Sequence, residues 1–141
     1  MRYPVILTPD DNGTVLMQAR DIPGVMSTGA NEADALVMGL DALLTVFDWY
    51  MSEGRPIPAP SDEPDDRLHI VVPALATVKL AIYEAMRDQG ISRVRLAALL
   101  QTSPKAVRRL LDLWHCSRWD QLERAMAVLG LKAVVDVRKA A

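Results

Sequence analysis

The amino-acid sequence predicts an α+β protein with two domains, an N-terminal domain of strands with one helix and a C-terminal all-helical domain. Apolar and polar side chains alternate with a period of two through most of the first 28 residues, as they do in half-buried β-strands. From residue 74 onward the apolar residues recur instead at helical spacing. We therefore expect domains at residues 1–73 and 74–141, with the boundary near Pro73.

Net charge divides the chain in nearly the same place. Residues 1–67 carry a net charge of −8, whereas residues 68–141 carry +6. A basic half suits a polyanion such as DNA, and an acidic half suits a basic protein partner. The plainer alternative is that both halves are only solvated surfaces.

A three-stranded antiparallel meander is expected at the N-terminus. The segments Arg2–Thr8, Thr14–Arg20 and Val25–Thr28 have the alternation or composition of strands. The turn Asp10–Gly13 contains Asn-Gly, which accepts the positive φ angles of a tight hairpin. The bend Asp21–Gly24 combines a proline, which has no backbone N–H, with a glycine that permits a sharp change of direction.

A long helix should follow the meander and cover the sheet. Asn31 can cap its first turn and Gly54 can end it. The segment Arg55–Asp66 then contains four prolines and several acids, which predicts an extended, exposed loop. Leu68–Val72 resumes strand character and is placed back in the first sheet. The predicted core stripe of the helix consists of Leu36, Leu40, Leu43, Leu44, Phe47, Tyr50 and Met51.

The second domain is expected to begin with one helix and to continue into a helix-turn-helix. Ala74–Asp88 is the first predicted helix, closed by Gly90. Ser92 can cap the next helix, Arg93–Leu100. Gln101-Thr102 then forms the turn, where such motifs often carry a glycine.

The helix after this turn is predicted to contact DNA. Ser103 caps it and Pro104 occupies its first position, where a missing N–H costs nothing. Its charged and apolar side chains lie on opposite faces, so that one face can pack while the other enters a major groove. Arginine can bond both O6 and N7 of guanine, and flanking cations can contact phosphates. The predicted DNA-binding residues are Arg93, Arg95, Ser103, Lys105, Arg108, Arg109, Ser117 and Arg118.

A fourth helix should run from Ser117 or Trp119 to about Gly130, and Leu131–Arg138 after it resembles a strand. A lone strand leaves its backbone groups unpaired. Pairing with the same strand of a second copy would make a two-fold homodimer, which could pair further into a tetramer. The competing interpretation is a return to the N-terminal sheet. The predicted dimerisation residues are Leu131, Ala133, Val135 and Val137.

Metal and membrane chemistry are not expected. His69, His115 and the single cysteine Cys116 lack the spacing of metal ligands. No apolar run reaches the roughly 18 residues that span a bilayer, and the N-terminal apolar segment is too short for a signal peptide. We therefore expect a cytoplasmic protein without membrane partners. Trp114 and Trp119 are interpreted as packing residues that fix the last helix.

Several motifs, in this order, resemble the HicB antitoxin family: RYPVILTPDDNGTV, DIPGV, TGANEADALVMGLDALLTVFDWY, RPIPAPS and the terminal helix-turn-helix. The resemblance spans nearly the whole chain. It implies a partial ribonuclease-H-like N-terminal domain that blocks a HicA toxin, a small basic mRNA-cleaving ribonuclease. It also implies a C-terminal domain that binds operator DNA and represses its own operon. The toxin-binding residues that it implies are Asp21, Pro23, Gly24, Asp34, Asp41 and Asp48.

A ribonuclease-H-like fold raises the question of catalysis. That chemistry needs several carboxylates gathered around two divalent metal ions, and one of these carboxylates lies in the middle of the first strand. Arg2–Thr8 contains no carboxylate, so we expect no catalytic residues, no cofactor and no enzymatic activity.

Three hypotheses follow for the function. The first is an antitoxin that neutralises a HicA-type ribonuclease and represses its own operon. The alternative is a stand-alone helix-turn-helix transcriptional regulator with a ligand-sensing N-terminal domain. The third is an adaptor in which the helix-turn-helix makes only protein contacts.

Overall fold

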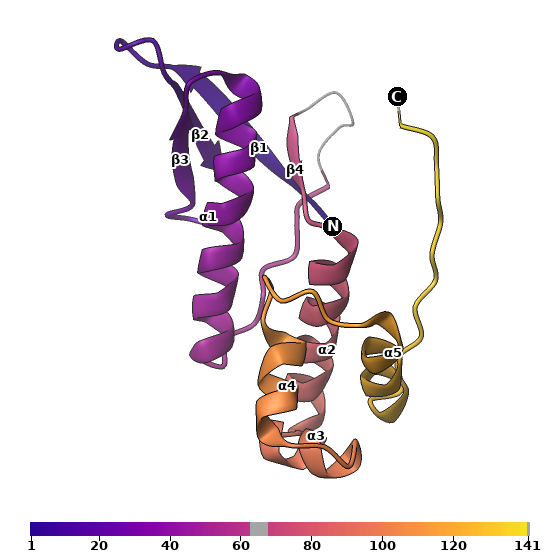
Figure 1. Ribbon diagram of the computed structural model, residues 1–141. Helices are drawn as coiled ribbons and strands as arrows, with labels where there is room; N and C mark the ends of the chain where they lie inside the picture. Colours follow the sequence, from indigo (N-terminus) through magenta and orange to yellow (C-terminus); the bar gives the residue numbers. More distant parts are fainter. Residues whose placement is uncertain (63–67, 141) are drawn as a thin grey trace. The chain divides into compact units, whose positions relative to one another are not determined.

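The structure is a computed structural model that describes residues 1–62 and 68–140 (Figure 1). The chain divides into two compact units, Met1–Thr77 and the residues from Val78 onward. The boundary between them falls after Thr77, a few residues beyond Pro73 and within the helix that begins at Ala74. Residues 63–66 of the predicted proline-rich loop lie outside the described residues.

The first unit contains a four-stranded antiparallel sheet. Its strands are β1 (Arg2–Pro9), β2 (Val15–Ala19), β3 (Met26–Gly29) and β4 (His69–Val71). The order across the sheet is β3-β2-β1-β4, so the predicted meander and the returning strand are both confirmed. The inward-facing residues of the meander include Tyr3 and Met17, both fully buried.

The hairpin between β1 and β2 has the geometry that its sequence predicts. Gly13 adopts a φ of +82°, which favours glycine. The Asp10 N–H donates to the Thr14 carbonyl at 2.8 Å, and Asn12 Oδ1 accepts from the Thr14 backbone and side chain. The Asn-Gly pair therefore sets the register in which β2 pairs with β1.

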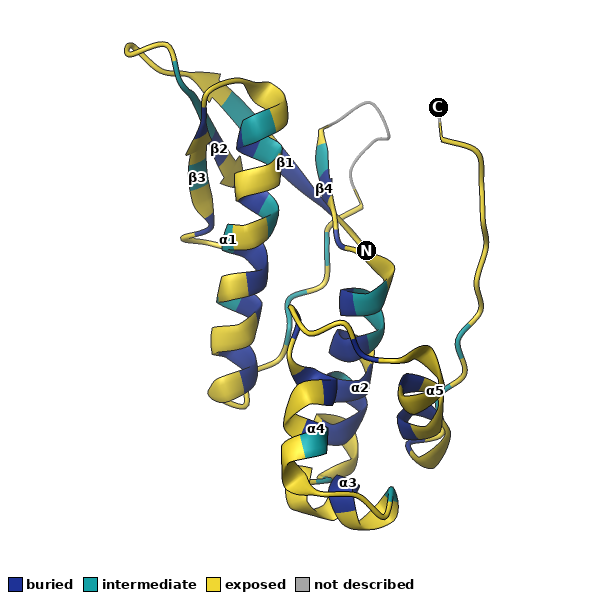
Figure 2. Ribbon diagram, viewed as in Figure 1, coloured by how far each residue is buried: buried dark blue, intermediate teal, exposed yellow. Residues whose placement is uncertain are grey.

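Helix α1 (Glu32–Ser52) packs on the sheet, and Asn31 caps it by accepting from the Asp34 N–H at 2.9 Å. Figure 2 shows α1 divided along its length into a buried and an exposed side. By length and composition alone α1 could cross a membrane, as the core helix of a globular unit often can. Its buried residues are Ala35, Gly39, Leu43, Leu44, Phe47, Tyr50 and Met51.

The predicted core stripe of α1 was therefore wrong in its first half. Leu36 and Leu40 are only half-buried, whereas Ala35 and Gly39 face the sheet. The reason is close approach between helix and sheet. A Cβ built on Gly39 would lie 2.5 Å from Met17 Cε and 2.9 Å from Ile70 Cδ1, so there is no room for a larger side chain at position 39.

The second unit contains all but the first turn of helix α2 (Ala74–Gln89), followed by α3 (Arg93–Leu99), α4 (Pro104–Leu111) and α5 (Trp119–Val128). All four were expected, with ends that differ by one or two residues. Ser92 and Ser103 cap α3 and α4 as predicted, each accepting from a backbone N–H three residues ahead. The core of this unit includes Leu80, Ile82, Met86, Leu96, Val107, Leu110, Leu111, Leu113, Leu122, Met126 and Leu129.

The turn between α3 and α4 is closed by a non-glycine residue in a left-handed conformation. Gln101 has a φ of +53°, and its N–H donates to the Ala98 carbonyl at 3.1 Å. The Thr102 N–H donates to the Ala97 carbonyl at 2.9 Å. Gln101 thus adopts the conformation that a glycine supplies in many helix-turn-helix motifs, so its identity does not count against that motif.

The C-terminal segment differs from the expectation. Residues 131–140 form neither helix nor strand, and the described sheet has no strand from this segment. The competing interpretation, a return to the N-terminal sheet, is therefore wrong for this structure. Val135 and Val137 are 70% and 87% exposed. A strand needs a neighbour to pair with, and this segment pairs with none of the described strands.

Replacing Gln101 with glycine should stabilise the protein. A left-handed conformation costs a side-chain-bearing residue about 1–2 kcal/mol, against about 0.5–1 kcal/mol of extra entropy that glycine loses on folding. We expect the melting temperature to rise by about 2 °C, measured by circular dichroism. Gln101→Ala is the matched control, because it keeps the Cβ and should give no gain. A lower melting temperature for Gln101→Gly would contradict the assignment of strain.

Candidate nucleic-acid interface and partner-binding surface

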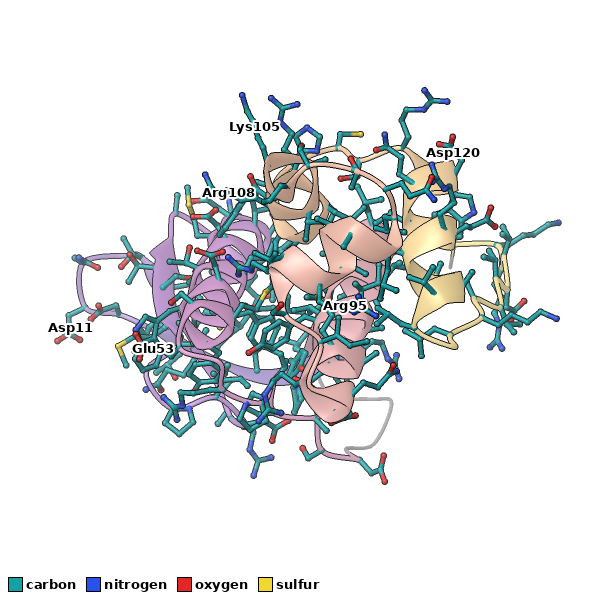
Figure 3. All side chains as sticks on the ribbon, turned by 90° about the horizontal axis from the view of Figure 1, so that it is seen from below. Asp11, Glu53, Arg95, Lys105, Arg108 and Asp120 are labelled. Carbon is teal, nitrogen blue, oxygen red and sulfur yellow. The ribbon has the colours of Figure 1, made fainter. Side chains whose placement is uncertain are left out.

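Helix α4 presents a basic face to solvent. Lys105, Arg108 and Arg109 are all exposed, whereas Val107 and Leu110 are buried beneath them. Figure 3 shows Lys105 and Arg108 extending outward from α4. The division follows from helical spacing, which places charged and apolar residues on opposite sides. The three cations are therefore free to approach an anionic partner together.

Further predicted DNA-binding residues flank this face. Arg93 and Arg95 are exposed on α3, and Arg95 is visible on that helix in Figure 3. Ser103 is exposed but its hydroxyl already accepts from the Ala106 N–H at 3.1 Å. Arg118 is exposed and forms an ion pair with Asp120 at 3.2 Å. These surface groups can still reach phosphates, since exposed ion pairs are weak.

Ser117 was predicted as a phosphate contact, but it is only 7% exposed. Its hydroxyl accepts from Lys79 Nζ at 2.9 Å and donates to the Arg109 carbonyl at 3.3 Å. Ser117 therefore has a structural role, which its position in the sequence did not reveal because the contact comes from a helix far back in the chain.

The sequence interpretation missed Lys79. This side chain is fully buried, and its ammonium donates to the carbonyls of Arg109, Asp112 and His115 at 3.1, 2.6 and 2.7 Å. A signal was present, because Lys79 lies three residues after Ala76 and four before Tyr83, both on the buried face of α2. Helical spacing alone would have placed it inside.

Burial lowers the pKa of Lys79 from the ordinary lysine value of 10.5, because a desolvated ammonium is disfavoured relative to the neutral amine. The negative charges of Asp112 and Cys116 oppose this effect without reversing it. The close acceptors nonetheless satisfy the ammonium's hydrogen-bonding capacity.

Exposed aromatic residues lie in the loop between α4 and α5 and at the first position of α5. Trp114 and Trp119 were interpreted as packing residues, but they are 50% and 39% exposed. Leu113 and Leu122, buried to 6% and 0% exposure, fill the core here instead. The free thiol of Cys116 is also exposed in this loop.

A second candidate surface lies on the exposed side of α1. Asp34, Asp41 and Asp48 recur at intervals of seven residues, which is close to two helical turns. Val37 and Trp49, beside this acidic row, are 67% and 51% exposed. A face that combines carboxylates with exposed apolar side chains suits a basic partner with apolar contacts of its own.

Some of the residues implied as toxin contacts hold the fold together. Asp34 Oδ2 accepts from the Ala30 N–H at 2.8 Å at the start of α1. Asp21 Oδ2 accepts from the Ser61 backbone and hydroxyl at 2.8 and 3.1 Å, which fixes the proline-rich loop. Pro23 and Gly24 are exposed in the bend before β3.

Within residues 1–62 and 68–140, no group of three or more His, Cys, Asp or Glu side chains is arranged to hold a metal ion.

Comparisons with known proteins agree on one family. The family model described as a HicB-like antitoxin of bacterial toxin–antitoxin systems matches residues 2–81. The chain is 35% identical over 130 residues to Antitoxin HicB 2 of Photorhabdus laumondii, covering 92% of this chain and 91% of that protein. It is 33% identical over 130 residues to Antitoxin HicB of Escherichia coli K12, covering 92% and 94% respectively.

Lys79 should release its proton below pH 10.5. Between its lowered pKa and 10.5 the unfolded chain binds this proton more tightly than the folded chain does. The group therefore makes the free energy of unfolding rise with pH across that interval. An NMR titration of the lysine ¹³Cε shifts would measure its pKa, with Lys79→Met identifying the resonance. A midpoint at or above 10.5 would show that the ammonium is not desolvated.

Proposed function

Since the chain belongs to the HicB family of toxin–antitoxin systems, whose antitoxins are not enzymes, we propose that it has two functions. It neutralises a small basic HicA-type ribonuclease through its first unit and represses its own operon through its second. The antitoxin relatives favour this function over that of a stand-alone regulator with a ligand-sensing domain. The proposed site of action is the cytoplasm, where both mRNA and operator DNA lie.

Toxin binding is assigned to the first unit and to the exposed side of α1. The family model covers residues 2–81, which include all of that unit except Met1. The observation that carries the assignment is the row of Asp41 and Asp48 beside the exposed Val37 and Trp49. A basic ribonuclease would be attracted by the carboxylates and held by the apolar contacts. Because HicB antitoxins are not enzymes, we expect neutralisation to consist of covering or distorting the toxin's own active site.

DNA binding is assigned to α4. Lys105, Arg108 and Arg109 are exposed on one side of a helix that is capped at its start and follows a tight turn. This arrangement matches the recognition helix of a helix-turn-helix, in which base contacts specify and flanking phosphate contacts position. Arg93, Arg95 and Arg118 are the proposed phosphate contacts, with Ser103 beside them, and Ser117 is withdrawn from the set.

A helix-turn-helix protein usually binds its operator as a two-fold symmetric dimer. The C-terminal segment exposes Val135 and Val137, and its sequence alternates as a strand does. We assign to it pairing with the same segment of a second copy, which would make a homodimer and leave open pairing into a tetramer. Two copies of α4 could then contact half-sites about 34 Å apart or a multiple of that distance.

Removing the three cations of α4 should abolish operator binding. The triple change Lys105→Ala, Arg108→Ala and Arg109→Ala removes contacts that are each worth about 1–3 kcal/mol of discrimination. We expect affinity for a promoter fragment to fall by more than about 100-fold, measured by fluorescence anisotropy, while toxin neutralisation in cells is unchanged.

The matched control for that variant replaces Arg2, Arg20 and Lys139 with alanine, which removes the same charge from exposed positions outside α4 and outside the proposed pairing segment, residues 131–138. It should retain most of the sequence-specific affinity. If the α4 triple variant still repressed its promoter, the recognition helix would be misassigned.

Reversing the charge of the α1 face should abolish toxin binding. We expect Asp41→Lys with Asp48→Lys to weaken binding of the adjacent gene's toxin by about 100-fold or more, because like charges facing each other cost several kcal/mol. Calorimetry with the purified toxin measures the affinity, and growth during toxin expression measures protection.

The control for the α1 variant is Asp11→Lys with Glu53→Lys, which makes the same charge change at exposed positions of the first unit outside this row. It should neutralise the toxin as the wild type does. Equal affinity of the two variants would place the toxin on another surface.

A further inference from the structure

Lysine is almost never fully buried unless its charge is paired, yet Lys79 has no exposed surface. Four oxygen atoms lie within 3.1 Å of its ammonium, from Arg109, Asp112, His115 and Ser117. An ammonium has three protons to donate, so it is fully satisfied at this place.

The four acceptors follow one another along the chain. The Arg109 carbonyl belongs to the last turn of α4, Asp112 caps that helix, His115 lies in the following loop, and Ser117 precedes α5. The last carbonyls of a helix have no partner within it and carry the negative end of the helix dipole. A cation at this position therefore compensates the end of α4 and fixes the chain up to the start of α5.

The same residues connect this buried cluster to the basic face. Arg109 offers its backbone carbonyl to Lys79 while its side chain is exposed among the cations of α4. Arg108 lies beside it in the same last turn. If the ammonium is removed, Asp112 and His115 lose the donor that their carbonyls share. The last turn can then fray or tilt, which moves Arg108 and Arg109 together.

We propose that Lys79 is a positioning residue for DNA recognition, whose buried ammonium ties α2 to the end of α4 and orients the basic face of that helix. This inference rests on the proposed DNA-binding function of α4. Lys79 itself does not touch DNA, because it is buried. It acts through the backbone of the residues that do.

The test compares two changes in α2 in the full-length protein. Lys79→Met keeps the length of the side chain and removes its donors. Gln89→Met is the matched control, because Gln89 Nε2 donates to the Leu129 carbonyl at 2.7 Å and so holds the end of α5 rather than of α4. Affinity is measured with a labelled double-stranded fragment of the promoter upstream of this gene, at a temperature where circular dichroism shows both variants folded.

We expect Lys79→Met to weaken DNA binding by about tenfold or more, and Gln89→Met to change it by less than about twofold. If both variants lose affinity in proportion to their loss of melting temperature, or if neither loses any, Lys79 only stabilises the fold and the inference is overturned. If the wild type does not bind the fragment, the DNA-binding function itself fails, which is a distinguishable result.

Chemical rescue separates a positioning role from general stabilisation. The double change Lys79→Cys with Cys116→Ser leaves a single thiol, at position 79, which 2-bromoethylamine converts in denaturant to a thioether analogue of lysine. After refolding, the alkylated protein should bind the fragment within about twofold of Cys116→Ser, while the unalkylated protein should not. Recovery of the melting temperature without recovery of affinity would overturn the inference.

A milder variant keeps the test decisive if Lys79→Met does not fold. Ser117→Ala removes one acceptor from the ammonium and leaves the three carbonyls in place. It should lower DNA affinity severalfold with little change in melting temperature. Unchanged affinity in a folded Ser117→Ala protein, together with failure of the alkylated protein to bind, would count against Lys79 as the positioning residue.

Discussion

A charge taken out of water must be paired, and in the second unit this requirement is met by one lysine and the end of one helix. The ammonium of Lys79, which would donate to water in the unfolded chain, donates instead to the carbonyls of Arg109, Asp112 and His115. Breaking such a buried arrangement by removing one partner is costly, because the remaining polar groups stay buried and unsatisfied. The orientation of α4, and with it the arrangement of its exposed cations, therefore depends on a residue in another helix.

The first unit solves a different packing problem. The sheet and α1 approach each other so closely that small residues, Ala35 and Gly39, occupy the contact. Leu36 and Leu40 are only half-buried there, and Val37 and Trp49 lie on the exposed side beside Asp41 and Asp48. Helix α1 is therefore a core element on one side and, on its exposed side, the proposed toxin-binding surface. The proposed function thus assigns an acidic surface of the first unit to a basic partner and a basic surface of the second unit to DNA.

Much of the fold could be predicted because it is encoded locally. Asn31, Ser92 and Ser103 cap helices through bonds to residues three positions away, and the hairpin turn depends on its own Asn-Gly pair. Alternation and helical spacing then identify the strands and most of the core.

The errors concern residues whose environment is set by distant segments. Ser117 resembles an exposed cap in the sequence, but Lys79, 38 residues earlier, draws its hydroxyl inside. Helical spacing predicts Leu36 in the core, but the structure leaves it half-buried. The close contact between helix and sheet at Gly39 involves Met17 and Ile70, and helical spacing does not take these distant residues into account. The C-terminal segment has a strand's pattern, but a strand forms only against a neighbour, and this segment pairs with none of the described strands.

The lone thiol of the chain has a practical consequence. Cys116 is exposed in the loop that leads from α4 towards α5, and the carbonyl of its neighbour His115 is anchored by Lys79. A fluorophore attached there would sit on a fixed backbone close to the end of α4, with no other thiol to compete for the label. The wild-type protein therefore provides a single attachment site for a fluorescent reporter, through which binding and release of a DNA duplex at α4 could be followed in real time.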